Sequence, residues 1–285
     1  MADISLLKTF LELSRSRHFG KTAKNLFLTQ SAVSARIKIL EDTLGVRLVT
    51  RDRNNIQLTP AGMRFLPYAE SVLTTWNRAR QEVGLDDENM QLLTMGAVSS
   101  LWETNLQPTL IKLRQEKQQL ALNIEVHGSD NLLRLINEDM LDLAFLFESP
   151  QLKGMHSESI GSLELVMVST QDGLSAEEAV NQSDYIMVDW GSSFAVNHAH
   201  LFPDMRPPMM RVSHGHLLIN YLTQNSGSAY MPRTMVHELI ENRRLFLVSD
   251  ADLIYRSFYA VHSESCTRQA LVDEVIEIAK NYSAN

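Results

Sequence analysis

The stretch Thr29-Gln30-Ser31-Ala32-Val33-Ser34 opens a segment, TQSAVSARIKILEDTLG at 29–45, that decides the fold of the first part of the chain. Threonine is a favourable helix N-cap and Gly45 a favourable C-cap, so the segment predicts a helix over 30–44. Apolar residues recur at helical spacing on one face: Val33, Ile37, Leu40 and Leu44. The other face carries small and polar side chains, which indicates a helix that packs on one side only.

The neighbouring segments complete a known arrangement of elements. Helical spacing predicts a first helix over 4–15, and Gly20 separates it from a short helix over 21–27. Residues 47–49 and 56–58 are predicted to be short strands on either side of the polar turn RDRNN. Three helices and a hairpin within 58 residues predict a winged helix-turn-helix, whose third helix enters the major groove of DNA.

The exposed face of that third helix suits contact with base edges. Gln30 can bind adenine through the oxygen and the nitrogen of its side-chain amide, and small residues let the helix backbone approach the bases. The polar turn suits contact with phosphates or the minor groove. The predicted DNA-binding residues are Gln30, Ser31, Ser34, Ala35, Lys38, Arg51, Arg53 and Asn54.

The distribution of charge fits a DNA-binding head, although the whole chain is acidic. Residues 1–84 hold thirteen Lys and Arg against seven Asp and Glu, a net charge of +6, which leaves −14 on a remainder that brings the 285-residue chain to −8. A basic amphipathic head also suits a protein-interaction module or a solvated surface. The order of helices, turn and wing favours DNA over both alternatives.

A second long helix follows the wing. Thr59-Pro60 is a helix start, and the helix is predicted to run to about residue 83. Apolar residues recur along it at spacings of four and three, which predicts a seam that pairs with another helix: Phe65, Ala69, Val72, Trp76, Ala79 and Val83. The polar segment 82–91 is predicted to be a linker.

Beyond residue 92 strands alternate with helices, which predicts a parallel sheet covered by helices. The fold class is therefore α/β overall, with an N-terminal winged helix-turn-helix and a long linker helix. The start of the chain has neither a signal-peptide pattern nor a membrane span, and a lone cysteine, Cys266, fits a reducing compartment, so the cytoplasm is expected.

The N-terminal segment resembles the signature of LysR-type transcriptional regulators. The resemblance is carried by TQSAVS at 29–34 together with Phe19, Ala23, Leu26, Ile37, Leu40-Glu41, Leu44-Gly45, Leu48, Arg51, Leu58-Thr59 and Gly62. Thr22 and Val49 depart from the usual alanine and phenylalanine. The resemblance implies a winged helix-turn-helix over 1–58, a dimerisation helix and hinge over 59–91, and an effector-binding domain of two α/β subdomains, like a periplasmic binding protein, over 92–285.

The same resemblance implies a regulator of transcription rather than an enzyme. Its partners would be double-stranded promoter DNA, an unidentified small-molecule effector and further copies of itself in a homodimer or homotetramer, with RNA polymerase a further candidate. Within the family, segments such as LPYAE at 66–70 resemble a branch that controls flagellar genes. A ligand-independent DNA-binding regulator, or an α/β enzyme with a DNA-binding head, remains the alternative.

Candidate effector contacts follow the predicted strands, because ligands of α/β sheets lie beyond the carboxyl ends of strands and helix N-termini favour anions. Ser99 and Ser100 are candidates for a carboxylate-like group. The full predicted set is Ser99, Ser100, Trp102, Ser129, Asp130, Glu148, Ser226 and Gly227. Each of these residues also fits an ordinary cap or turn.

Catalytic and metal sites are not expected. The chain has no GxSxG, GxGxxG or GxxxxGK[ST] motif, and no cofactor is predicted. Pairs of histidines, 198 with 200 and 214 with 216, have a spacing that suits metal binding on a strand. They lack a nearby cysteine or an HExxH motif, so loop and surface histidines are the expectation. Without a second cysteine, Cys266 is not expected to act as a redox sensor.

Overall fold

The computed structural model describes residues 3–52, 55–84 and 91–283, and the chain divides into two compact units, Met1–Glu88 and Asn89–Asn285. The elements of the first unit are α1 (Ile4–Ser16), α2 (Phe19–Asn25), α3 (Gln30–Leu44), β1 (Val49–Asp52), β2 (Asn55–Leu58) and α4 (Pro60–Val83). Among the described helices of both units, none is both long and apolar enough to cross a bilayer.

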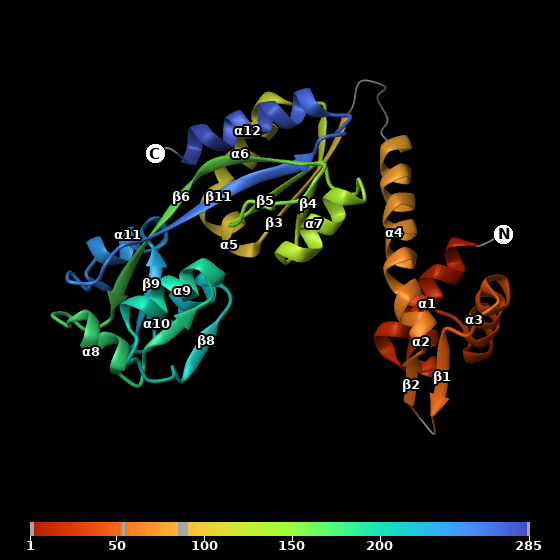
Figure 1. The fold of residues 1–285 in the computed structure, drawn as a ribbon, viewed down its shortest axis with the longest axis horizontal. Helices are drawn as coiled ribbons and strands as arrows, with labels where there is room; N and C mark the ends of the chain where they lie inside the picture. The colour runs from red at the N-terminus through yellow and green to blue at the C-terminus, as the bar shows by residue number, and fades with distance from the viewer. Residues whose placement is uncertain (1–2, 53–54, 85–90, 284–285) are drawn as a thin grey trace. The chain divides into compact units, whose positions relative to one another are not determined.

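The first unit is a three-helix head with a hairpin. Helices α1, α2 and α3 pack around a common apolar core, and β1 pairs with β2 in antiparallel register (Figure 1). The core includes Phe10 on α1, Val33 and Ile37 on α3, and Leu48 before β1. Helix α2 begins two residues earlier than predicted because the His18 side chain caps it, accepting a hydrogen bond from the Lys21 N–H.

Helix α4 begins where the wing returns to the core. The hydroxyl of Thr59 accepts a hydrogen bond of 2.9 Å from the Gly62 N–H and donates one of 2.7 Å to the Arg47 carbonyl. Gly62 lies so close to the wing that an added Cβ would come within 2.1 Å of the Leu48 carbonyl oxygen. A side chain at position 62 would therefore push α4 away from the wing.

The second unit is a mixed α/β body. Its strands are β3 (Gln91–Ala97), β4 (Leu120–Val126), β5 (Leu143–Leu146), β6 (Met155–Ser169), β7 (Ile186–Val188), β8 (Met210–Val212), β9 (Ser228–Pro232), β10 (Phe246–Leu247) and β11 (Ile254–Ser263). Its helices are α5 (Ser99–Leu101), the π-helix η1 (Trp102–Leu106), α6 (Gln107–Glu116), α7 (Ser129–Asn137), α8 (Ala176–Asn181), α9 (Ser192–Leu201), α10 (Gly215–Leu222), α11 (Arg233–Glu241) and α12 (Gln269–Ser283).

The prediction of a parallel sheet is correct for only part of the body. Strand β3 pairs in parallel with β4 and β5, and β7 pairs in parallel with β8. The two longest strands, β6 and β11, are antiparallel to each other, and β11 is antiparallel to β5. The chain runs out along β6, forms β7 to β10 and comes back along β11, so β6 and β11 point in opposite directions. The alternation of strands with helices does not reveal this reversal.

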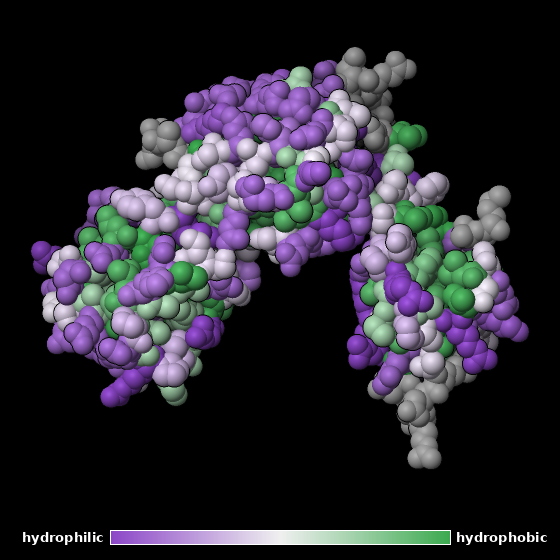
Figure 2. All heavy atoms as spheres, in the orientation of Figure 1, coloured by the Kyte–Doolittle hydropathy of each residue, from purple (hydrophilic) through white to green (hydrophobic). Residues whose placement is uncertain are grey.

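Strands β6 and β11 join two lobes of the body (Figure 1). We call lobe I the part built on β3, β4 and β5 with α6, α7 and α12, and lobe II the part built on β7, β8 and β9 with α8 to α11. At one end β11 pairs with β5 through Tyr259–Val261; at the other, β6 pairs with β9 through Leu165–Ser169. The outer surface of α12 is hydrophilic in Figure 2, as expected for a helix that buries only one face.

Candidate functional site

Helix α3 presents a polar face on the head. The Thr29 hydroxyl accepts a hydrogen bond of 3.2 Å from the Ala32 N–H, and Gly45 ends the helix at a φ of 70°. The predicted inner residues Val33, Ile37 and Leu40 are buried, whereas Leu44 is 39% exposed because the last turn extends beyond the core. On the outer face Gln30, Ser31, Ala35 and Lys38 are exposed and Ser34 is half-buried.

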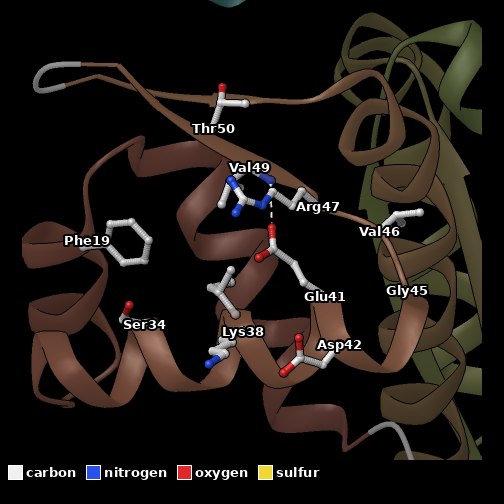
Figure 3. A pocket seen from close by; sticks show the side chains of 11 residues that line it. Phe19, Ser34, Lys38, Glu41, Asp42, Gly45, Val46, Arg47, Val49 and Thr50 are labelled. Carbon is white, nitrogen blue, oxygen red and sulfur yellow. Dashed lines mark hydrogen bonds between the residues drawn. The ribbon is translucent and has the colours of Figure 1, made fainter.

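A groove of about 760 Å³ separates α3 from the wing (Figure 3). Its lining includes Ser34 and Lys38 from α3 and Arg47 and Thr50 from the wing side. The Glu41 carboxylate accepts hydrogen bonds from the backbone N–H groups of Leu48, at 2.7 Å, and Val49, at 3.1 Å. The groove therefore lies between α3 and the wing, and the hydrogen bonds of Glu41 link these two elements.

The predicted wing contacts are only partly described. Arg53 and Asn54 lie outside the described residues. The backbone of Arg51 belongs to β1, and its side chain lies outside the description. The DNA-contact role of these three residues stays a prediction.

Phe27, in the turn between α2 and α3, is a candidate contact that the sequence interpretation missed. Its side chain is 95% exposed, and its backbone has a φ of 54°, a left-handed conformation that is unfavourable for a bulky residue. The turn is held by hydrogen bonds from Phe27 N–H to the Lys24 carbonyl and from Leu28 N–H to the Ala23 carbonyl. The helix predicted over 21–27 includes Phe27, whereas α2 ends at Asn25, so the sequence pattern gave no signal of this turn.

The apolar seam of α4 is divided between two roles. Phe65 and Ala69 pack on the head core, with the rings of Phe65 and of Phe10 on α1 at 5.4 Å, so this part of the seam faces a helix of its own head. The sequence pattern could not show that the head covers the first turns of α4. Further along, Val72, Trp76 and Val83 are 48%, 47% and 86% exposed, and hydrophobic side chains reach the surface along α4 in Figure 2.

Two predicted effector residues lie where lobe I meets lobe II. The Ser99 hydroxyl, after β3, donates a hydrogen bond of 3.0 Å to Glu103 and lies 2.9 Å from Nδ1 of His214 in lobe II. The Glu148 carboxylate, after β5, accepts a hydrogen bond from the hydroxyl of Ser192 at the start of α9. Ser99 and Glu148 thus each join the two lobes.

The other predicted effector residues lie elsewhere. Ser100 and Trp102 are buried in lobe I, where the Trp102 indole donates to the Glu125 carbonyl at 3.0 Å. Ser129 and Asp130 are exposed at the start of α7. Ser226 is exposed, and the Gly227 N–H donates to the Thr170 hydroxyl at 2.9 Å in lobe II. Side chains far apart in sequence converge at the lobe junction, but only Ser99 and Glu148 of the predicted set do so.

Arg256 on β11 is a residue of the junction that the sequence interpretation missed. Its side chain is 3% exposed, its Nε donates to the Trp190 carbonyl at 2.9 Å, and its guanidinium carbon lies 4.9 Å from the centre of the Phe147 ring. Alternation along Ile254-Tyr255-Arg256-Ser257-Phe258 places Arg256 on the buried face. A charged residue at an inward-facing position between Ile254 and Phe258 was a signal in the sequence that Arg256 is buried.

None of the four paired histidines lies on a strand, because His198 and His200 lie on α9, His216 lies on α10 and His214 is the N-cap of α10. His198 is buried on α9 with its Nε2 2.6 Å from the Tyr185 hydroxyl, and burial lowers its pKa to about 4. His214 and His216 lie 3.7 and 3.9 Å from the Glu103 carboxylate. Among the described residues, no group of three or more His, Cys, Asp or Glu side chains is arranged to hold a metal ion.

A winged helix-turn-helix followed by a two-lobed α/β body defines a DNA-binding regulator with a ligand-binding domain. Residues 4–63 match the bacterial regulatory helix-turn-helix of the lysR family, and residues 86–284 match the LysR substrate binding domain. The chain belongs to the LysR family of bacterial transcriptional regulators. It is a DNA-binding transcriptional regulator with an effector-binding domain, and its family consists of regulators rather than enzymes.

Relatives of known name support this assignment along the whole chain. The HTH-type transcriptional regulator HdfR of Yersinia enterocolitica is 37% identical over 293 residues, covering 99% of this chain and 98% of the relative. HdfR of Yersinia pestis is 36% identical over 287 residues, covering 98% and 97%. The resemblance to the branch represented by HdfR is thereby confirmed.

Solved structures of the family share the fold. The LysR family regulator CbnR covers 99% of this chain and all of its own, with a TM-score of 0.76 at 15% identity. A full-length OxyR variant from Pseudomonas aeruginosa covers 99% and 96%, with a TM-score of 0.57 at 17% identity. LysG from Corynebacterium glutamicum with bound effector Arg covers 97% and 98%, with a TM-score of 0.52 at 19% identity. The predicted fold class is confirmed.

Proposed function

We propose that this chain is a homo-oligomeric regulator that binds specific promoter sequences and whose DNA binding is modulated by a small molecule held in its body. The observation that carries the proposal is the outer face of α3, where exposed small and polar side chains border a groove whose lining includes Lys38 and Arg47. In helix-turn-helix proteins this helix reads base edges in the major groove. The body beyond the head supplies the regulatory input.

The proposed DNA contacts lie on α3 and the wing. Gln30, Ser31, Ser34, Ala35 and Lys38 would face base edges or phosphates from α3, and Arg51, Arg53 and Asn54 would contact the backbone or the minor groove. We add Phe27, whose exposed ring precedes the N-cap Thr29 by two residues. A ring at this place can contact a thymine methyl group or a deoxyribose, which explains an apolar residue in a strained, exposed turn.

The exposed part of α4 supports a dimer. Val72, Trp76, Ala79 and Val83 continue the spacing of four and three on a helix face that the head leaves uncovered. A two-fold pair of such helices would place two heads on DNA, so operators are expected to be palindrome-like. Further contacts between bodies would convert the homodimer to a homotetramer. The proposed division is 1–58 for DNA binding, 59–91 for dimerisation and 92–285 for sensing and assembly.

The junction between lobes I and II supports an effector site. Ser99 and Glu148 join the lobes through hydrogen bonds to His214 and Ser192. A ligand that replaces such bonds would favour one arrangement of the lobes and thereby one arrangement of the heads. The related regulator LysG has been solved with arginine bound as its effector. The proposed effector of this chain is a small molecule that binds at this junction. RNA polymerase is the proposed downstream partner.

The target pathway is proposed from the sequence resemblance to a branch of the family that controls flagellar genes. We infer that this chain, like the branch it resembles, controls flagellar or motility genes from the bacterial cytoplasm, where its DNA lies. Genome-wide mapping of bound DNA, combined with soft-agar swimming of a deletion strain, tests this inference. Bound sites upstream of flagellar genes and altered swimming are expected; binding sites elsewhere with unchanged swimming would contradict it.

DNase footprinting on the mapped sites tests the regulatory proposal. A protected region with two half-sites is expected, and its extent should shift when a pool of cellular metabolites is added. A footprint that no metabolite changes would favour the ligand-independent regulator. The absence of any sequence-specific footprint would overturn the function itself.

A further inference from the structure

A buried cation lies at the junction of the two lobes. Only 3% of Arg256 is exposed, and burying a guanidinium is costly unless an anion or several hydrogen-bond acceptors compensate it. Its Nε donates to the Trp190 carbonyl, and its carbon lies over the Phe147 ring. In the part of the chain that the structure describes, its Nη2 has no hydrogen-bond partner. The Nη2 group of this guanidinium is thus a buried hydrogen-bond donor without an acceptor among the described residues.

This Nη2 group lies against the start of a helix. A Cβ added to Gly191 would come within 2.7 Å of Nη2, and Gly191 is the N-cap of the ten-residue helix α9. This cap provides no side-chain hydrogen bond to the first helical turn, as far as the described residues show. The free N–H groups of a first turn carry partial positive charge and favour anions. The guanidinium and the helix start therefore attract the same kind of group.

A carboxylate of the protein itself lies beside this position. Glu148 accepts a hydrogen bond from the Ser192 hydroxyl in the first turn of α9, although Glu148 belongs to lobe I. Burial lowers the pKa of Arg256, and Glu148, Tyr259 and Asp189 oppose that shift, Glu148 most strongly. Glu148 is exposed to solvent, so it can leave the helix start without crossing the core.

We propose that Arg256 and the first turn of α9 form a binding site for the carboxylate group of a small molecule, and that Glu148, hydrogen-bonded to Ser192 beside this site, competes with the ligand through its negative charge. The proposal rests on the function proposed above, because it names the chemical class of that effector. The ligand carboxylate would supply the hydrogen-bond acceptor that Nη2 of Arg256 lacks within the described part of the chain, and its charge would favour release of the bond between Glu148 and Ser192.

The neighbouring acid limits the ligand to a single negative charge at this point. The Asp189 carboxylate accepts a hydrogen bond of 3.0 Å from the Gly191 N–H and stays beside the site. A phosphate dianion would add a second charge next to Asp189, whereas a carboxylate would only replace that of Glu148. The site therefore favours a carboxylic acid over a phosphate ester.

Acetate is the probe that tests the site, because it is a carboxylate with almost no other chemistry. The full-length protein is titrated with acetate, acetamide and phosphate at constant ionic strength, and the thermal unfolding of the body is followed. In Glu148→Gln the internal competitor is weakened, so acetate should bind about tenfold more tightly than to the unchanged protein. Acetamide and phosphate should produce no comparable shift in either protein.

Three further variants complete the test. Glu238→Gln removes an exposed carboxylate on α11 and should leave acetate binding unchanged. Arg256→Gln in the Glu148→Gln background should abolish the acetate response. If that double variant fails to fold, Ser192→Ala takes its place. Ser192→Ala also frees Glu148, so it should raise the acetate affinity of the otherwise unchanged chain. Equal acetate affinity in the Glu148→Gln, Glu238→Gln and unchanged proteins, or equal responses to acetate and acetamide, would overturn the site.

DNA binding is measured on the same samples, so that failure of the proposed carboxylate site can be distinguished from failure of the proposed DNA-binding function. Loss of the acetate effect with intact operator binding would overturn only the carboxylate site. An acetate response in a protein that binds no specific DNA would overturn only the proposed function.

Discussion

The carboxylate of Glu41 on α3 accepts a hydrogen bond of 2.7 Å from the backbone N–H of Leu48, the residue before the wing strand β1. The recognition helix and the wing are thereby joined by a charged acceptor rather than by apolar packing alone. Hydrogen bonds from N–H groups to a carboxylate are stronger than those to a neutral acceptor. The orientation of the wing relative to α3 depends on this side chain.

Changing Glu41→Gln should loosen the wing. The amide keeps one acceptor but loses the charge, so the free energy of local opening at Leu48 and Val49 should fall by about 1–2 kcal/mol. Amide hydrogen exchange of the full chain measures this opening. Asp42→Asn, the next residue on the same groove, is the control and should leave both amides as protected as before. Equal protection in all three proteins would contradict the role of Glu41.

Changing Ser34→Glu should abolish specific DNA binding without unfolding the head. The added carboxylate would face base edges and phosphates from the outer face of α3. Gel-shift with a DNA fragment selected in vitro by the unchanged protein measures the affinity, and circular dichroism checks the fold. Thr43→Glu makes the same charge change at the other end of α3 and should have a much smaller effect. Unchanged affinity in Ser34→Glu would contradict the assignment of the recognition face.

Replacing Phe27 should separate stability from DNA binding. Phe27→Gly and Phe27→Ala both remove the ring, so both should weaken binding to the selected DNA to a similar extent. Only glycine tolerates the φ of 54° without strain, so Phe27→Gly should be more stable than Phe27→Ala by about 1 kcal/mol. Urea unfolding of the full chain gives the difference. Full DNA affinity in both variants would show that the ring does not contact DNA.

Changing Trp76→Glu should dissociate the oligomer. Trp76 is 47% exposed on the uncovered face of α4, and a charge there would be buried between two helices in a dimer. Sedimentation velocity should show a shift toward the monomer at micromolar concentration. Asn77→Glu, one residue away on a different face, should leave the oligomer intact. An intact oligomer in Trp76→Glu would place the interface elsewhere.

The buried His198 should make the body less stable in acid. Burial lowers its pKa in the folded state to about 4 from 6.5, so between these pH values the unfolded state binds more protons than the folded state. The free energy of unfolding should therefore fall as the pH decreases from 6.5 to 4, by about 1.4 kcal/mol per pH unit from this group. Urea unfolding at several pH values, followed by tryptophan fluorescence, measures the slope.

Two variants isolate the contribution of His198. His198→Gln keeps a polar partner for the Tyr185 hydroxyl but does not titrate, so its stability should depend less on pH in this range. His200→Gln removes an exposed histidine from the same helix and should keep the slope of the unchanged protein. The same slope in all three proteins would show that His198 does not control acid stability.

The sequence by itself determined the head and the class of protein. Residues that define α3 act locally: Thr29 caps the first turn, Gly45 ends the last turn, and the spacing of Val33, Ile37 and Leu40 selects the buried face. Such signals operate within one helix and need no knowledge of distant segments. The division of charge between a basic head and an acidic body was likewise visible without coordinates.

The tertiary structure alone decided what depends on contacts between distant segments. The pattern of α4 could not show that the head covers Phe65 while leaving Trp76 exposed. Strand periodicity could mark Arg256 as inward-facing, yet only the crossing of β11 between the lobes places it against Gly191 and near Glu148. Burial and charge pairing arise from segments brought together by the fold, so no local pattern of residues encodes them.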